Sequence, residues 1–472
     1  MIREKEDPAL QTPMMRQYLA VKERYSKEII FFRMGDFYEM FFDDARVASE
    51  ILGIALTSRS KDKDAIPMAG VPVRAVNSYL PRLLKAGKRV AICDQMEDPK
   101  DARGLVSREV VKVISPGTIT DERLVGEKSN NYICAFTPGA DVYGIGWLDL
   151  TTGRFVLWES ADRGAVCAQI QRLEPAECLL PDSLAFNLSR LEDVERALTG
   201  VARTPYPDPW FERDAGYRTL VEHFHTKTLE GFGCEHLRAA LGAGGALLRY
   251  VGETQMASLE HISKVTAFPA SRHVPIDRPT RHALELVETQ RGQEGQGTVL
   301  ASLDATRTAG GGRLLREWLL APLTAVDAIQ ERLDAVGELV SDGELRSRLT
   351  ELLREVHDVE RIATRIGLRS ANARDLVALR RTLEVMPAIR AELTPRQSAF
   401  LQRAAERLDH HEDLCREITR GLVDAPPLSI KEGGLVRDGY DAEVDELKSI
   451  AAQGTQWMAR FQAEESQRTG IS

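Results

Sequence analysis

The sequence predicts a multidomain protein in which two mixed α/β units precede an all-α part. The chain has 472 residues, which corresponds to about three domains of roughly 150 residues each. Short apolar runs that suit strands alternate with helical patterns until about residue 255. Beyond that point apolar residues recur at three- and four-residue spacing, with Arg and Glu between them, and this pattern is typical of long helices.

The first unit, residues 1–120, alternates helix and strand signals. Thr12 followed by Pro13 is a helix-start signal, so we expect a helix over Met14–Arg24. Two aromatic-rich strands flank the turn Met34-Gly35-Asp36. The predicted strands are Glu28–Arg33, Phe37–Phe42, Arg89–Asp94 and Glu109–Ile114, and a second helix covers Val76–Lys85 despite Pro81.

The second unit begins after a polar joint, Asp121–Asn131, and the helical part follows it. Strands are predicted over Tyr132–Phe136, Val142–Leu150, Gly153–Trp158 and Glu177–Leu180, with a helix over Ala161–Leu173. Helices are then predicted over Leu314–Leu319, Val326–Val340, Leu345–Ile366 and Arg374–Leu393. The last segment, Ser429–Ser472, starts with glycines and stops in a charged helix without a cap, which suggests a truncation within a domain.

Composition excludes several classes of protein. The net charge of −9 argues against a protein that simply coats nucleic acid, although residues 1–120 hold 20 Lys/Arg against 17 Asp/Glu. The six cysteines include no Cys-x-x-Cys pair, so we expect neither a disulfide scaffold nor a zinc knuckle. The charged N-terminus lacks the apolar core of a signal peptide, and no apolar run approaches the ~20 residues that span a bilayer. A cytoplasmic protein is expected.

The most informative stretch is Phe31–Ala45. Residues two apart in a strand share a face, so Phe37 and Glu39 are expected to point the same way and Tyr38 the other way. An aromatic wedge beside a carboxylate suits minor-groove recognition, in which an apolar side chain enters between base steps. The alternative is a core hairpin with one exposed Glu, because aromatic strands are usually core.

Several blocks in chain order closely resemble the start of the MutS family of DNA mismatch-repair proteins. The resemblance covers essentially the whole chain. The blocks are Thr12-Pro13-Met14-Met15, Arg33-Met34-Gly35-Asp36-Phe37-Tyr38-Glu39, Ile66-Pro67-Met68-Ala69-Gly70-Val71-Pro72, Val90-Ala91-Ile92-Cys93-Asp94-Gln95, Ser115-Pro116-Gly117-Thr118, Leu300–Arg316 with Trp318-Leu319, Asp358-Val359-Glu360-Arg361-Ile362, and Gly434-Leu435-Val436-Arg437-Asp438-Gly439-Tyr440-Asp441.

This resemblance implies roles for single residues. The family's Phe-x-Glu mismatch motif falls on Phe37, which would stack on the mispaired base, and on Glu39, which would hydrogen-bond to that base. Arg59 and Met68 lie in blocks that face DNA in the family and are possible DNA contacts. The segment Val71-Pro72-Val73-Arg74 departs from relatives, which often carry an aromatic residue and a His after the Pro.

The resemblance also implies architecture and partners. Residues 1–120 resemble the α/β mismatch-recognition domain, 125–255 the α/β ribonuclease-H-like connector, 256–435 the helical core and lever, and 436–472 the start of the DNA clamp. The implied partners are mismatched or looped duplex DNA, a downstream MutL-like factor that binds the connector, and a second copy in the full-length protein. The implied location is the bacterial cytoplasm, with nucleoid association when DNA is bound.

The family's ATPase, which uses ATP and Mg²⁺, requires a phosphate loop that is absent from this sequence. No G-x-x-x-x-G-K-[ST] run occurs, and the nearest Gly-rich run, Gly242-Ala243-Gly244-Gly245, has no following Lys. We interpret that run as helix-packing glycines or a loop. The chain is therefore expected to be an N-terminal fragment that has no catalytic residues, needs no cofactor and does not hydrolyse ATP.

Three alternatives stay open at this stage. Zinc could be held by His223, His225, Cys234 and His236, although their spacing is less regular than that of usual zinc sites. A metal-dependent nuclease of ribonuclease-H-like type could use Asp149, with Glu177 and Asp182 as further candidate acids. The third alternative is a protein-interaction scaffold, which is compatible with mismatch recognition.

Overall fold

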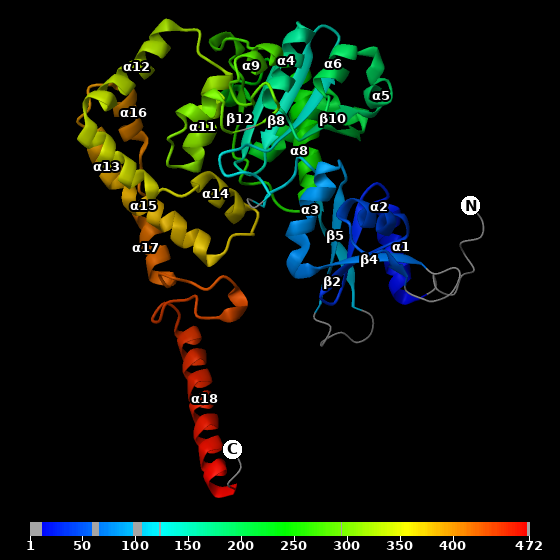
Figure 1. The fold of residues 1–472 in the computed structure, drawn as a ribbon, viewed down its shortest axis with the longest axis vertical. Helices are drawn as coiled ribbons and strands as arrows, with labels where there is room; N and C mark the ends of the chain where they lie inside the picture. The colour runs from blue at the N-terminus through cyan, green and yellow to red at the C-terminus, as the bar shows by residue number, and fades with distance from the viewer. Residues whose placement is uncertain (1–11, 59–65, 98–105, 122–123, 294, 470–472) are drawn as a thin grey trace. The chain divides into compact units, whose positions relative to one another are not determined.

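The structure is a computed structural model that describes residues 12–58, 66–97, 106–121, 124–293 and 295–469 (Figure 1). Contacts divide the chain into two compact units. The first is Met1–Ile329 with Ala363–Arg369, and the second is Gln330–Ile362 with Ser370–Ser472. Two mixed sheets lie in the first unit, and the second unit is built from helices. The predicted multidomain organisation, with mixed α/β and helical parts, is confirmed.

The N-terminal sheet has the strand order β3-β4-β2-β1-β5-β6. Its neighbouring strands are antiparallel, except that β1 and β5 are parallel. The elements in chain order are α1 (Pro13–Arg24), β1 (Ile29–Met34), β2 (Phe37–Phe41), α2 (Phe42–Leu52), β3 (Thr57–Ser58), β4 (Pro67–Pro72), η2 (Val73–Ala75), α3 (Val76–Lys85), β5 (Val90–Gln95) and β6 (Arg108–Ile114).

Helices cover both faces of this sheet. α1 packs on one face through Met14, Met15 and Tyr18, and α2 and α3 pack on the other. α1 begins where the sequence predicts, because the Thr12 hydroxyl accepts a hydrogen bond from the Met15 amide and Pro13 occupies the first turn. The predicted helix Val76–Lys85 is also confirmed as α3.

This unit differs from the predictions at the end of β2 and in α2, β3 and β4, for which no element is predicted. The strand expected over Phe37–Phe42 ends at Phe41, because the chain turns at Phe42 (φ +54°) and α2 begins there. No strand is predicted over Pro67–Pro72, but β4 lies there, with a proline, a residue disfavoured inside sheets, at each of its ends. Its residues Met68–Pro72 nevertheless pair with β2.

The second sheet has the order β11-β10-β7-β8-β9-β12. Strands β7, β8 and β9 form an antiparallel meander, whereas β10 is parallel to β7, β11 to β10 and β12 to β9. The elements are β7 (Tyr132–Pro138), β8 (Tyr143–Asp149), β9 (Arg154–Ser160), α4 (Arg163–Leu173), β10 (Glu177–Pro181), α5 (Asp182–Ala185), η3 (Leu188–Arg190), α6 (Glu192–Ala197), β11 (Ala202–Tyr206), η4 (Asp208–Phe211), α7 (Arg213–Phe224), η5 (Glu230–Phe232), α8 (Ala239–Gln255) and β12 (Val265–Ala267).

Two hydrophobic cores enclose this second sheet. Alternate residues of β7 face opposite sides, so Ile133 and Ala135 pack with α7 and α8, while Cys134 and Phe136 pack with α4 and α6. The Gly-rich run 242–245 lies inside α8, which confirms helix-packing glycines. A Cβ added at Gly244 would lie 2.7 Å from the Leu157 side chain, so glycine allows this close approach.

The remaining elements are helical and span both units. They are η6 (Ala270–Arg272), α9 (Arg278–Ala283), α10 (Val299–Leu303), α11 (Ala309–Leu320), α12 (Val326–Ser341), α13 (Gly343–Arg354), α14 (Val359–Gly367), α15 (Ala373–Leu393), α16 (Ala399–Arg407), α17 (Glu412–Gly421), η7 (Ile430–Glu432) and α18 (Ala442–Thr469). Among the described residues, no helix combines the length and apolarity that crossing a bilayer requires.

The prediction of one helix over Leu345–Ile366 is wrong, because the helix is interrupted between α13 and α14. The His357 amide donates to the Thr382 hydroxyl at 2.9 Å instead of continuing the helical hydrogen bonds. The Asp358 carboxylate then accepts from the Arg361 amide (3.4 Å) and starts α14. Side-chain competition for the backbone thus ends one helix and begins the next.

Candidate nucleic-acid interface

The β1–β2 hairpin places the two predicted recognition residues on one face of the N-terminal sheet. Its turn consists of Gly35 and Asp36, and Gly35 has the positive φ (+61°) that a tight turn needs and glycine tolerates. The pairing aligns Met34 with Phe37 and Phe32 with Glu39. Side chains alternate along β2, so Phe37 and Glu39 share a face.

Phe37 is the exposed aromatic residue of this hairpin. Its side chain is 47% exposed, whereas Phe31, Phe32 and Phe41 are each 0% exposed. The alternative of a core hairpin with only Glu39 exposed is therefore wrong at Phe37. The buried phenylalanines anchor the two strands in the cores of the sheet, and Phe37 lies outside both cores.

Glu39 is half-buried and lies on the same face of β2 as Phe37. It pairs with Gly70, and a Cβ added there would lie 3.8 Å from both Phe37 Cδ1 and Glu39 Cγ. Because Gly70 has no side chain, nothing at that position separates the ring from the carboxylate.

Arg108 of β6 contributes a positive charge to the same region. Its guanidinium lies 5.1 Å from the Phe32 ring centroid, and its Nε donates to the Arg33 carbonyl oxygen at 2.7 Å. Burial lowers the pKa of Arg108, whereas the nearby Cys93 and Glu39 raise it. The Glu39 carboxylate is thus within electrostatic range of a guanidinium that is itself held by the backbone.

Polar contacts on the opposite face fix the hairpin. Asp94 accepts from Arg33 Nη1 at 2.7 Å and from the Tyr38 hydroxyl at 3.3 Å. Burial, with a further contribution from Asp94, raises the pKa of Tyr38 to about 12. The Val73 amide also donates to the Asp36 carbonyl oxygen at 2.8 Å, so the divergent loop 71–74 is tied to the turn.

The two further predicted contacts have different outcomes. Met68 of β4 pairs with Phe41 of β2 and is half-buried. It lies on the same face of the sheet as Gly70 but two residues farther from Phe37. It packs against the core beneath α1. Arg59 lies outside the described residues.

Gly70 and Arg108 lie in this candidate interface and were not singled out from the sequence. Gly70 lies in the quoted block Ile66–Pro72, but its position opposite Glu39 depends on the β2–β4 register. Arg108 lies on β6, 69 residues after Glu39 in the sequence. No local sequence pattern links Arg108 to Glu39.

The three acids of the nuclease alternative do not converge. Asp149 ends β8 and Glu177 begins β10 at the same edge of the sheet, whereas Asp182 follows the other end of β10. That five-residue strand separates Glu177 from Asp182 by about 16 Å. Asp149 Oδ1 accepts from the Thr151 amide (2.9 Å) and hydroxyl (2.7 Å).

Glu177 is fully buried and its carboxylate is occupied by protein donors. Two of them come from the segment that follows β6, so Glu177 joins that segment to the second sheet. The four donors are the Ser115 hydroxyl, the Gly117 amide (3.0 Å), the Thr204 hydroxyl (2.6 Å) and the Tyr250 hydroxyl (2.7 Å). This pattern indicates a structural carboxylate.

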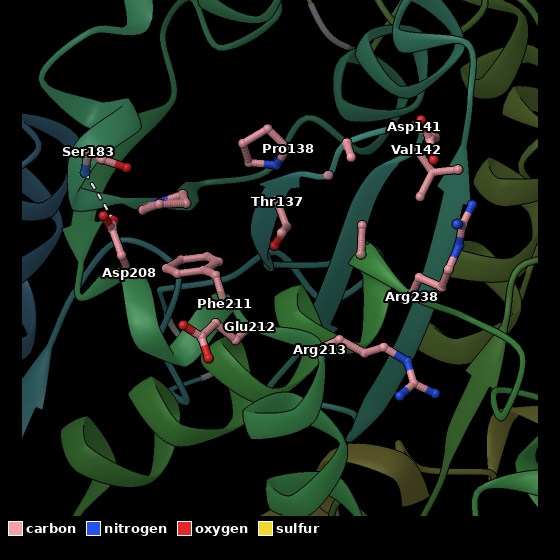
Figure 2. A pocket seen from close by; sticks show the side chains of 14 residues that line it. Thr137, Pro138, Asp141, Val142, Ser183, Asp208, Phe211, Glu212, Arg213 and Arg238 are labelled. Atoms are coloured by element: carbon pink, nitrogen blue, oxygen red, sulfur yellow. Dashed lines mark hydrogen bonds between the residues drawn. The ribbon is translucent and has the colours of Figure 1, made fainter.

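A cavity of about 490 Å³ lies at the carboxyl ends of β7 and β10, where open α/β sheets often bind ligands (Figure 2). Asp141 and Asp208 lie on opposite sides of the view, and Asp208 accepts from the Ser183 amide at 3.0 Å. Across the described ranges, no three His, Cys, Asp or Glu side chains form a group that could hold a metal. The nuclease alternative is not favoured.

The histidines and cysteine of the zinc alternative make separate contacts. His223 Nε2 lies 2.8 Å from the Ile262 carbonyl oxygen, and the buried Cys234 thiol donates to the Phe232 carbonyl oxygen at 3.4 Å. His225 ends α7 in a left-handed conformation. His236 is exposed.

Matches to models of known protein families cover nearly the whole chain. The model for MutS domain I matches residues 12–123, that for MutS domain II matches 131–263, and that for MutS domain III matches 279–466. The first match contains the whole β1–β2 hairpin and its partner strand β4. The second contains most of the second sheet, and the third is predominantly helical.

Curated relatives give the same assignment. The chain is similar to the DNA mismatch repair protein MutS of Symbiobacterium thermophilum (42% identity over 470 residues), of Halothermothrix orenii (39% over 479) and of Methanosarcina barkeri (41% over 482). These alignments cover 98% of this chain and 54%, 51% and 53% of the respective relatives, so the chain spans about half their length. The family predicted from the sequence is confirmed: the chain belongs to the MutS family and matches its domains I, II and III.

Proposed function

We propose that this chain recognises mispaired or unpaired bases in duplex DNA and so initiates mismatch repair. Phe37 enters from the minor groove and stacks on the mispaired base, and Glu39 hydrogen-bonds to that base. The observation that carries this proposal is the 47% exposure of Phe37 among fully buried phenylalanines. A rigidly held, exposed apolar side chain suits a wedge between base steps.

The expected interaction energies favour discrimination between mispaired and matched DNA more than high affinity for DNA in general. Stacking of a base on an aromatic ring contributes about 1–3 kcal/mol, and a mispaired base costs least to unstack. The Glu39 carboxylate repels phosphates, so it weakens binding to matched DNA, where no displaced base is present to donate a hydrogen bond to it. Arg108 limits this repulsion, because its guanidinium lies within electrostatic range of Glu39.

We also propose domain limits for the chain. These are mismatch recognition over 1–120, a ribonuclease-H-like connector over 125–255, core and lever helices over 256–435, and the start of a clamp over 436–472. The strand order β11-β10-β7-β8-β9 supports a ribonuclease-H-like fold for the connector. In it the antiparallel meander β7-β8-β9 is extended beside β7 by the two parallel strands β10 and β11. Bound DNA would meet the first of these domains at Phe37.

The longer protein would have further partners. We propose that the connector binds a downstream MutL-like factor, and that the full-length protein is a cytoplasmic homodimer that uses ATP and Mg²⁺ and associates with the nucleoid on DNA. The 472 residues contain no phosphate loop, so we propose no ATP turnover for them. A scaffold role through the helical part is compatible with this function.

Fluorescence of 2-aminopurine next to a single mispair tests the stacking step. Binding of the chain should change that fluorescence with mispaired duplex and leave it nearly unchanged with matched duplex. Phe37→Leu keeps an apolar side chain without the ring and should remove the change. Phe186→Leu is the matched control, because Phe186 is 82% exposed in the second sheet domain. A change that persists in Phe37→Leu would rule out the wedge.

A further inference from the structure

Helix α18, in the second unit, carries a row of exposed apolar side chains. Each member of the row is between 50% and 65% exposed: Leu447, Ile450, Trp457, Met458 and Phe461. We call these five side chains the α18 stripe. The helix has 28 residues, which corresponds to a length of about 42 Å, and it is drawn in red in Figure 1. Between residues 449 and 464, every residue that the structure describes is exposed.

The spacing of the α18 stripe is that of a coiled-coil seam. Leu447, Ile450, Gly454, Trp457 and Phe461 follow one another at intervals of three, four, three and four residues. This alternation keeps one face of a helix turned toward a partner helix. A Cβ added at Gly454 would meet no atom within 4 Å, so a large side chain of another helix has room at the middle of the stripe.

The contacts that tie α18 to the preceding loop lie outside the stripe. Lys448 Nζ donates to the Val436 carbonyl oxygen at 2.7 Å and to Asp438 Oδ1 at 2.9 Å. The Gly439 amide donates to Asp445 Oδ2 at 2.7 Å. A helix in water gains most of its stability by packing an apolar face, and a continuous exposed apolar surface marks an interaction site. The α18 stripe is therefore a docking surface.

We propose that α18 pairs with α18 of a second copy of this chain as an antiparallel two-helix coiled coil. In the register that places Ile450 opposite Gly454 of the second copy, Leu447 lies opposite Trp457 of the second copy. Each of these layers occurs twice, because the pair has two-fold symmetry. A branched side chain thus faces the gap at glycine in one layer, and two large apolar side chains meet in the other.

The charges beside the stripe favour a second copy in this orientation. In the same register Glu446 lies next to Arg460 of the second copy, again twice, and charges that flank a coiled-coil seam set its orientation. A parallel pair would place Gly454 opposite Gly454 and Trp457 opposite Trp457. That arrangement would leave a gap beside two crowded rings, which is unfavourable packing. The α18 stripe is thus complementary to itself when it is antiparallel, and this pairing does not depend on the proposed mismatch recognition.

Sedimentation equilibrium of the 472-residue chain tests the pairing. The chain should change from monomer to dimer with a Kd on the order of micromolar, because two helices bury a small interface. Ile450→Asp places a charge in the seam and should raise this Kd about tenfold or more. Ala452→Asp is the matched control, because Ala452 is exposed on the opposite face of α18, and its Kd should stay within about twofold. A chain that stays monomeric would overturn the proposal, and so would a dimer that persists in Ile450→Asp through another surface, such as the exposed apolar side chains of α12.

Reversal of charge tests the partner and the orientation together. Glu446→Arg should raise the dimer Kd about tenfold, because it turns two attractive pairs into two repulsive ones, and Arg460→Glu should do the same. A chain that carries both reversals regains opposite charges at each pair, so its Kd should return close to that of the unmodified chain. If the double variant dimerised no better than either single variant, antiparallel pairing of α18 would be refuted.

Discussion

Replacing Phe37 by Ala tests whether this residue belongs to the interface or to the core. A fully buried Phe→Ala change costs about 3–5 kcal/mol of folding free energy, including the cavity that remains. Phe37 is 47% exposed, so about half of the transfer free energy is lost and no closed cavity forms. The expected cost is therefore about 1–1.5 kcal/mol. Phe41→Ala, at a fully buried position of the same strand, should show the full cost.

Hydrogen exchange of backbone amides is the suitable assay. All five tryptophans lie at or beyond position 147, outside the N-terminal sheet, so their fluorescence does not report on that sheet. Exchange of peptides covering β1 and β2 gives the opening free energy of this sheet directly. If Phe37→Ala lowered this opening free energy as much as Phe41→Ala, the ring would be a core residue and its exposed position would be refuted.

Two further changes test the interface, and a third tests a buried histidine beside the second sheet. Glu39→Gln removes a negative charge near the phosphates and should raise matched-duplex affinity several-fold at low salt, measured by anisotropy; unchanged affinity would count against the charge argument. Gly70→Ala should change sheet stability by less than about 1 kcal/mol, yet its methyl group, 3.8 Å from Phe37 and Glu39, should reduce mispair preference. Burial and the neighbouring His223 lower the pKa of His261 to about 4, so the unfolded chain binds more protons between pH 6.5 and 4. Stability should fall as pH drops through that window, by up to about 1.4 kcal/mol per unit, and His261→Gln should flatten the slope.

The sequence predicted the hairpin well because its signals are local. The glycine turn, the alternation of side chains and the block around Phe37 all lie within one stretch, and the register follows from the turn. The exposure of each phenylalanine side chain does not follow from local signals in the same way. Phe31, Phe32, Phe37 and Phe41 are the same residue type and differ in which parts of the chain pack over them. Tyr18 of α1 packs against Phe32 and Phe41, whereas Phe37 belongs to neither core of this sheet.

Other features depend on contacts between distant segments. The break before α14 requires Thr382, which is 25 residues from His357. Glu177 is a candidate metal ligand in the sequence, but in the structure it accepts hydrogen bonds from residues up to 73 positions away in the chain. The ion pair between Arg154 of β9 and Glu317 of α11 joins residues 163 positions apart, and it depends on how α11 packs. A single sequence carries no signal for such pairings.

The affinity ratio between mispaired and matched duplexes tests the central claim most directly. Fluorescence anisotropy at about 50 mM salt, where phosphate contacts support binding, should give a preference for a duplex with one mispair. This preference should be weak at physiological salt. Phe37→Ala should bring the ratio close to one while matched-duplex affinity stays within about twofold, because phosphate contacts are retained. Phe186→Ala should match the unmodified chain. A ratio that survives in Phe37→Ala, or affinities that fall equally for both duplexes, would contradict mismatch recognition by Phe37.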